Sequence, residues 1–263
     1  MTTRHPRATS WWVAVPLLVV VAGLMGCTPQ AADLARSPTV VTTPPSPSVS
    51  SADGDERPLR DPTLDQPLIR AAAAGDTARV KRLLALGARP RATDQLGRTA
   101  LVAAAYGNHL GVVRALLDVG ADVNTQDSSQ QSAYLIATSE VGDDVRLLEL
   151  MLAHGARVNA KDSFNGTGLI RAADRGYPRV VRRLLAAGVT VDHVNDLGWT
   201  ALHEAIILGD GGPAYVRVVE LLIDAGADVN LASGRDGVRP LAHAVDRGLT
   251  AIAQRLRAAG ARR

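Results

Sequence analysis

Two adjacent residues, His203 and Glu204, are the first candidates in this 263-residue chain for acid–base chemistry or metal binding. An imidazole beside a carboxylate can move a proton or hold a cation. Neither residue completes a motif, because the sequence has no His-Glu-x-x-His, phosphate-binding-loop or Gly-x-Ser-x-Gly pattern. His154, His193 and His243 are dispersed along the chain, and we expect them at the surface.

Two further sets of polar residues could bind ions. Residues 122–124 and 228–230, both Asp-Val-Asn, carry oxygen atoms of the kind that calcium prefers. Arginines gather between residues 171 and 183, where they could meet a nucleic acid or an anionic lipid. Without residues 1–27 the chain holds 27 basic and 26 acidic residues, so a solvated face or a set of ion pairs is the alternative.

The elements that must position these residues recur along the chain. Residues 200–203, Thr-Ala-Leu-His, precede an apolar run at 218–222 and a Gly-Ala-Asp-Val-Asn stretch at 226–230. In four of the six units a Thr or Ser that can cap a helix leads into one helical segment, and a Gly follows the next segment. The positions equivalent to Thr200 are separated by 33, 33, 35, 33 and 39 residues, and they are 66, 99, 132, 167, 200 and 239.

This pattern resembles the ankyrin repeat, which has a period near 33 residues and a Thr-Pro-Leu-His-x-Ala core. The resemblance implies an all-α solenoid of helix-turn-helix units with β-turn fingers. One unit buries too little apolar surface to fold alone, so the units must stack. The resemblance covers residues 61–263 in six copies, at about 61–93, 94–126, 127–161, 162–194, 195–232 and 233–263.

Several copies depart from this pattern. Asn108 replaces an expected glycine, and we expect it to take the same left-handed conformation. The third copy lacks the glycine of its turn, and Tyr134 replaces a buried leucine. The fifth copy has five extra residues at 210–214, which we expect to form a loop on the functional face.

Residues 1–26 resemble a bacterial lipoprotein signal peptide. Basic residues precede an apolar run over residues 11–24, which is shorter than the ~18 residues of a membrane-spanning helix. The run ends in Leu-Met-Gly-Cys, which resembles a lipobox and implies that Cys27 carries lipid at the mature N-terminus. An incidental cysteine after an ordinary signal peptide, or an uncleaved anchor, is the alternative. Cys27 is the sole cysteine, so the chain can form no internal disulfide.

Residues 27–60 are rich in proline, serine and threonine and poor in large apolar side chains. Such a composition predicts a disordered tether that holds the folded part away from a membrane. A motif for a proline-binding domain is the alternative.

The resemblance also argues against acid–base or metal chemistry at His203 and Glu204, and against calcium binding by the Asp-Val-Asn runs. His203 falls on the histidine of the repeat motif, where an imidazole bridges turns through hydrogen bonds. The Asp-Val-Asn runs fall on the ordinary end of a repeat. We therefore expect no catalytic residue, no metal and no cofactor.

What the resemblance implies instead is a concave surface that binds another protein through the finger tips and the first helices. Large aromatic residues and arginine dominate such interfaces. We expect the partner to contact Leu96, Tyr106, Phe164, Arg175, Leu197 and Trp199. In the alternative reading, Trp199 folds back on its own turn and seals the stack. The wider surface also includes Arg98, Gln131, Glu140, Asp174, Ile207, Arg235 and Arg247.

The sequence therefore predicts an exported, lipid-anchored, monomeric adaptor on the extracytoplasmic side of a cell membrane, which binds a protein and no nucleic acid. Two other classes stay open. One is an enzyme, or an accessory subunit, that acts on envelope glycans, with residues 210–214 shaping a cleft. The other is a nucleic-acid-binding protein that uses the arginine cluster.

Overall fold

The computed structural model describes residues 61–263, in which two helices lie within each repeat range that the sequence predicts. The expected signal peptide, residues 1–26, and the expected linker, residues 27–60 with Cys27, lie outside the described residues. A short 3-10 helix, η1 (Pro62–Leu64), comes first. The α-helices are α1 (Asp65–Ala73), α2 (Thr77–Ala85), α3 (Ala100–Tyr106), α4 (Leu110–Leu117), α5 (Ala133–Ser139), α6 (Val145–Ala153), α7 (Gly168–Asp174), α8 (Pro178–Ala186), α9 (Ala201–Ile207), α10 (Pro213–Asp224), α11 (Pro240–Asp246) and α12 (Thr250–Ala258).

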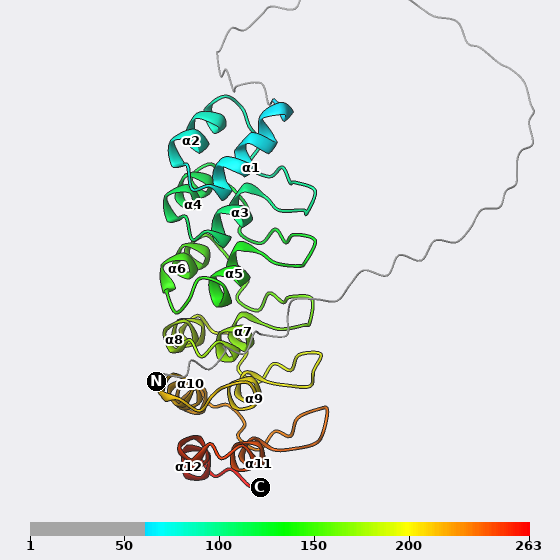
Figure 1. Ribbon diagram of the computed structural model, residues 1–263, viewed down its shortest axis with the longest axis vertical. Helices are drawn as coiled ribbons and strands as arrows, with labels where there is room; N and C mark the ends of the chain where they lie inside the picture. The colour runs from blue at the N-terminus through cyan, green and yellow to red at the C-terminus, as the bar shows by residue number, and fades with distance from the viewer. Residues whose placement is uncertain (1–60) are drawn as a thin grey trace, which may run out of the picture. The chain divides into compact units, whose positions relative to one another are not determined.

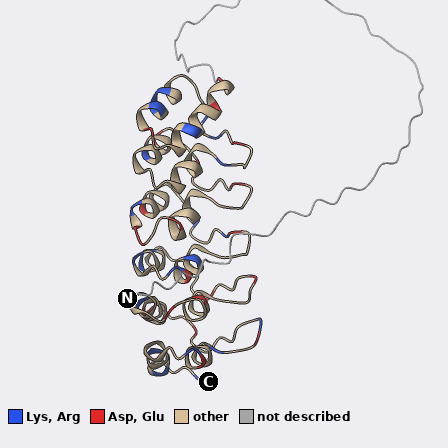
Figure 2. Ribbon diagram, viewed as in Figure 1, with Lys and Arg blue, Asp and Glu red and all other residues tan. Residues whose placement is uncertain are grey.

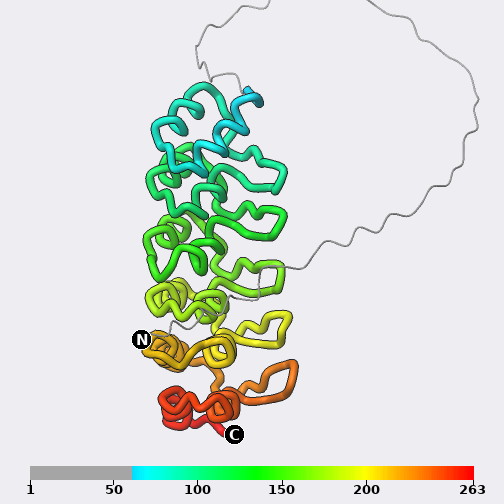
Figure 3. Tube along the Cα trace, viewed as in Figure 1, coloured from blue at the N-terminus to red at the C-terminus, as the bar shows by residue number. Residues whose placement is uncertain are grey.

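The helices stack in two columns (Figures 1 and 3). Each odd-numbered helix packs against its even-numbered partner and against the next odd-numbered helix. The even-numbered helices form the outer column, and hairpin fingers project from the side of the inner, odd-numbered column (Figure 1). The all-α repeat solenoid predicted from the sequence is confirmed for residues 61–263. No helix in this range has both the length and the apolar character needed to cross a bilayer.

Capping side chains explain why the inner helices begin where they do. The Thr99 and Ser132 side chains accept hydrogen bonds from the backbone N–H groups of Val102 and Leu135, at 3.2 Å in both cases. Such caps satisfy donors that a helix start leaves free. Asn108 has a φ of +50°, which confirms that it takes the left-handed conformation expected of a glycine.

Small and aliphatic side chains fill the space between the columns. Ala103, Ala104 and Ala105 of α3 are buried, so neighbouring inner helices can approach closely. Tyr134 is fully buried in the place of a leucine. Its hydroxyl donates a hydrogen bond of 2.7 Å to the Val158 carbonyl group, which satisfies a polar group that burial would otherwise penalise.

Backbone hydrogen bonds join neighbouring fingers at their tips. The Leu96 carbonyl accepts from Ser128 N–H at 2.9 Å, and the Phe164 carbonyl accepts from Asp196 N–H at 3.0 Å. In the same way, the Gly198 carbonyl accepts from the backbone N–H of residue 234 at 2.8 Å. A side chain at Gly198 would lie 2.8 Å from the next finger, so this contact requires glycine. The tips are therefore held side by side.

Residues 210–212 of the insertion form a loop between α9 and α10, as the sequence predicts, whereas residues 213 and 214 begin α10. Pro213 occupies the first turn of α10, a position that suits its fixed φ and missing N–H. Helix α10 has 12 residues, compared with 9 in α8. Tyr215, in its first turn, donates a hydrogen bond of 2.8 Å to the Asp174 carbonyl group. The insertion thus lengthens an outer helix and anchors it to the preceding repeat.

Candidate functional site

The finger tips present apolar side chains in a common register. Leu96, Phe164 and Leu197 each lie three residues before the threonine at the N-cap position of the following inner helix. The Leu96 side chain is 57% exposed and the Phe164 side chain 44% exposed, whereas Leu197 is half-buried. Backbone hydrogen bonds tie the Phe164 finger to the Leu197 finger, and tie the Leu96 finger to the finger that follows it.

The ends of the inner helices border these fingers. Tyr106, the last residue of α3, is 43% exposed, and Arg175, directly after α7, is half-buried. Sequence reasoning missed Leu208, which follows α9 and is 44% exposed. It singled out the preceding residue, Ile207, which is half-buried. The repeat register in the sequence could have identified Leu208, because it occupies the same position in its repeat as Arg175.

Trp199 is less open than Phe164. Its side chain is half-buried, and its backbone N–H donates a hydrogen bond of 3.0 Å to the Asn195 side-chain oxygen. The indole Nε1 is buried and finds no hydrogen-bond acceptor within residues 61–263. This geometry is closer to the alternative in which Trp199 packs on its own repeat.

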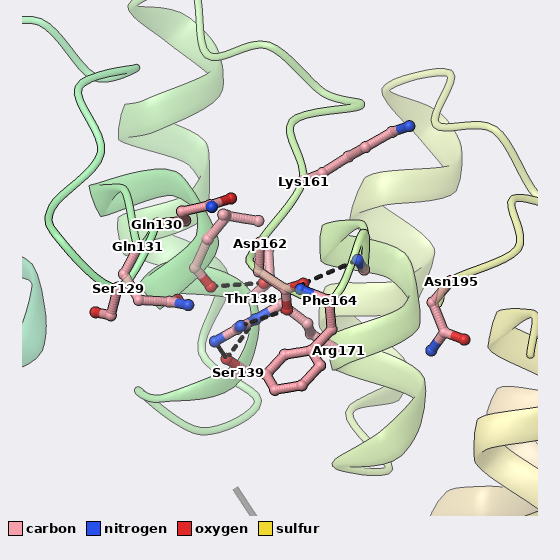
Figure 4. A network of polar contacts seen from close by, with 12 residues as sticks. Ser129, Gln130, Gln131, Thr138, Ser139, Lys161, Asp162, Phe164, Arg171 and Asn195 are labelled. Atoms are coloured by element: carbon pink, nitrogen blue, oxygen red, sulfur yellow. Dashed lines mark hydrogen bonds and ion pairs between the residues drawn. The ribbon is translucent and has the colours of Figure 1, made fainter. Parts of the chain in front are cut away.

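Arg171 links three parts of the stack (Figure 4). From α7, its guanidinium group donates to the Asp162 carboxylate at 2.9 Å and to the Ser139 hydroxyl at 3.0 Å. It also lies 3.2 Å from Glu140, which is 3.7 Å from Arg175. Only 15% of the Arg171 side chain is exposed. Arg171 therefore braces the interior, and it does not belong to an exposed arginine cluster.

The next repeat makes a related contact with different chemistry. Asn195 takes the place of Asp162, and its Nδ2 donates a hydrogen bond of 2.8 Å to Oε1 of Glu204. Glu204 is 1% exposed, and its Oε2 has no hydrogen-bond partner among the described residues. Burial, together with the nearby negative charge of Asp174, raises the pKa of Glu204 to about 8. The carboxyl group is therefore mostly protonated at neutral pH.

His203 caps its own helix. Its Nδ1 lies 2.9 Å from the Thr200 hydroxyl, whose oxygen in turn accepts from the His203 backbone N–H at 3.4 Å. Burial lowers the pKa of His203 to about 4, and the adjacent His243 acts in the same direction. The imidazole is neutral at physiological pH. The expectation that His243 lies at the surface is wrong, because its side chain is 16% exposed and its ring packs edge-on to His203.

These contacts leave the most perturbed ionisable groups inside the stack. His203 and Glu204 are both about as buried as the apolar core. Within residues 61–263 no group of three or more His, Cys, Asp and Glu side chains could hold a metal ion. What faces solvent on the finger side is a mixed set of apolar tips and charged helix ends.

Comparison with known proteins identifies the family. The family model for ankyrin repeats matches the chain three times, over residues 68–162, 135–233 and 169–262. YahD of Escherichia coli (strain K12), named as an ankyrin repeat protein, is 40% identical over 192 residues, which are 73% of this chain and 94% of YahD. A crystal structure of an ankyrin repeat domain from Acinetobacter baumannii AYE is 45% identical, with a TM-score of 0.71, and covers 74% of this chain and 98% of that domain. The ankyrin repeat protein EF0377 is 34% identical, with a TM-score of 0.68, and covers 74% of this chain and 97% of its own. The chain therefore belongs to the ankyrin repeat family.

Proposed function

We propose that this protein is an exported, lipid-anchored adaptor that binds another protein with its finger tips and the ends of its inner helices. The position of the exposed apolar side chains carries this proposal. Within residues 61–263, four of the seven exposed large apolar residues lie on that side: Leu96, Tyr106, Phe164 and Leu208. Exposed apolar side chains that gather in one region, rather than being scattered singly, are typical of an interaction site.

Charged groups complete the proposed interface. Glu140 and Arg175 lie at the ends of α5 and α7, next to the apolar tips. An apolar centre with a polar rim is the usual composition of a protein–protein interface. Phe164 is the proposed anchor, with Leu96, Tyr106, Arg175 and Leu208 around it. Leu197 and Trp199, both half-buried, would support the tips more than contact the partner.

The burial of the two candidate acid–base groups supports a non-enzymatic role. Glu204 and His203, whose pKa values are shifted to about 8 and about 4, are both 1% exposed. A catalytic group must reach its substrate, and these two cannot without unfolding their repeat. The glycan-enzyme alternative relied on a cleft shaped by residues 210–214, of which residues 210–212 form a short loop and residues 213 and 214 begin α10.

Membrane attachment is the part of the proposal that rests on sequence alone. The apolar leader and the Leu-Met-Gly-Cys stretch support lipid at Cys27. Acyl chains contribute about 0.8 kcal/mol per buried CH₂, and two signals are needed for a stable anchor. Residues 27–60 would then give the folded repeats reach from the lipid.

The proposed interface can be tested with a double substitution at the finger tips. We expect Leu96→Ala with Phe164→Ala to reduce recovery of the partner from crosslinked cell envelopes roughly tenfold or more, because hot-spot side chains contribute ~2 kcal/mol each. The matched control is Leu86→Ala with Val119→Ala. These two residues are 57% and 50% exposed and lie at the ends of the outer helices α2 and α4.

Both variants should keep the helical circular dichroism of the unsubstituted protein, because all four side chains are exposed. Equal recovery by the finger-tip variant and the control variant would reject the proposed interface.

A further inference from the structure

The two columns of helices carry different charge balances. The outer helices α2, α4, α6 and α8 hold eight basic residues and one acidic residue. Their inner partners α1, α3, α5 and α7 hold two of each. Figure 2 shows this segregation as blue ribbon along the outer column. The formal net charge of the whole chain, +3, does not reveal this difference between the columns.

Helix α8 carries three of these basic residues. Arg179 and Arg182 are exposed and Arg183 is half-buried. Their spacing places them on one side of the helix, while Val180, Val181 and Leu184 on the other side are fully buried. None of the three arginines forms an ion pair with another residue of the described part of the chain. The Asp143 carboxylate is near, but it accepts from the backbone N–H groups at the start of α8.

Helices α2 and α4 extend the same surface. Arg79, Lys81 and Arg82 of α2 and Arg114 of α4 are exposed, and within residues 61–263 they too form no ion pair. Arg146 of α6 differs, because Asp144 neutralises it at 2.6 Å. We name the basic residues of α2, α4 and α8 the outer basic face.

The composition of this face favours a lipid surface over a nucleic acid. Helices α2, α4, α6 and α8 contain no aromatic residue, and stacking on aromatic rings is what holds single-stranded nucleic acid. Exposed apolar side chains follow two of the helices, Leu86 after α2 and Val119 after α4. Basic groups beside apolar side chains suit the headgroup region of a bilayer. Each basic residue near an anionic leaflet contributes about 1 kcal/mol, within a Debye length.

We propose that the outer basic face docks onto an anionic phospholipid surface. Several outer helices meet the lipid at once, because they stack in one column (Figure 1). The fingers project from the other column, so they remain open to a partner while the protein lies on the membrane. Docking of this kind does not depend on lipid at Cys27.

The test uses the full chain with Cys27→Ser and vesicles of phosphatidylcholine with or without phosphatidylglycerol. Co-sedimentation should show preferential binding to the phosphatidylglycerol vesicles, weakened by salt. We expect Arg179→Gln with Arg182→Gln and Arg183→Gln to weaken that preference roughly a hundredfold, since three charges leave the face. The leader contributes equally in every variant, so it does not affect the comparison.

The matched control removes three exposed charges elsewhere, with Arg91→Gln, Lys161→Gln and Arg235→Gln in the hairpin segments. It should bind the vesicles as the Cys27→Ser chain does. An equal loss in both triple variants would overturn the proposal, because net charge alone would then explain binding. Equal binding to both kinds of vesicle would also overturn the proposal. The same holds if the α8 triple variant loses binding to duplex DNA while its binding to vesicles is unchanged. Circular dichroism confirms that each variant is folded.

Discussion

Replacing Glu204 with glutamine should remove the loss of stability that its carboxyl group causes as the pH rises from 5 to 8. The buried carboxyl has a pKa of about 8 in the folded protein, compared with the ordinary value of 4.5. The folded state therefore keeps a proton that the unfolded state loses across this window. The resulting stabilisation is complete below the unfolded pKa and is lost as the pH rises through the folded pKa, by ~3–5 kcal/mol in total.

The measurement is the free energy of unfolding from urea titrations at pH 5 and pH 8. Glutamine resembles the protonated acid, and its carbonyl can still accept the hydrogen bond from Asn195. Glu204→Gln should therefore match the unsubstituted protein within ~1 kcal/mol at pH 5 and exceed it by several at pH 8. Glu149→Gln, at an exposed site on α6, is the control and should change neither value. Parallel pH profiles for Glu204→Gln and the unsubstituted protein would contradict this account.

Removing the Arg171 side chain should cause the second large effect. Arg171→Met should lower the free energy of unfolding by roughly 3 kcal/mol, because it leaves a buried carboxylate without its cation. Asp162 is 6% exposed and would keep only its backbone donors, the N–H groups of Phe164 and Gly166. Arg182→Met, at an exposed position on α8, should change stability by less than ~0.5 kcal/mol.

A double-mutant cycle separates the pair from its surroundings. Asp162→Asn copies the amide that the next repeat has at Asn195. The double variant with Arg171→Met should lose ~1–3 kcal/mol less free energy of unfolding than the sum of the two single variants, because both substitutions remove the same ion pair. Strictly additive costs would show that Arg171 and Asp162 do not stabilise each other.

The fold was predictable because the repeat period is encoded in capping and turn residues. Thr99, Ser132 and Thr200 mark helix starts that the structure confirms. The left-handed conformation of Asn108 was also predictable, because asparagine can replace glycine at such a position. The loop predicted at residues 210–214 is confirmed for residues 210–212, whereas the helix-initiating position of Pro213 places residues 213 and 214 in α10.

The candidate surface was only partly predictable. The register of the fingers placed Leu96 and Phe164 at exposed tips, but the exposure of Leu208 and the burial of Trp199 depend on side-chain packing. The contact between Asn195 and Glu204 joins two elements and has no sequence motif.

The arginines between residues 171 and 183 read as one cluster in the sequence. The turn between α7 and α8 separates them, so Arg171 braces the inner column while Arg179 and its neighbours face outward. A net charge near zero could not indicate this separation.

The central claim is that the finger tips hold the partner, and site-specific photocrosslinking in intact cells tests it most directly. A photoreactive residue is placed at position 96 or 164 on the tips, or at position 86 on an outer helix. The account predicts the same discrete adduct from both tip positions and none of that adduct from position 86. An adduct from position 86 with none from either tip would contradict it.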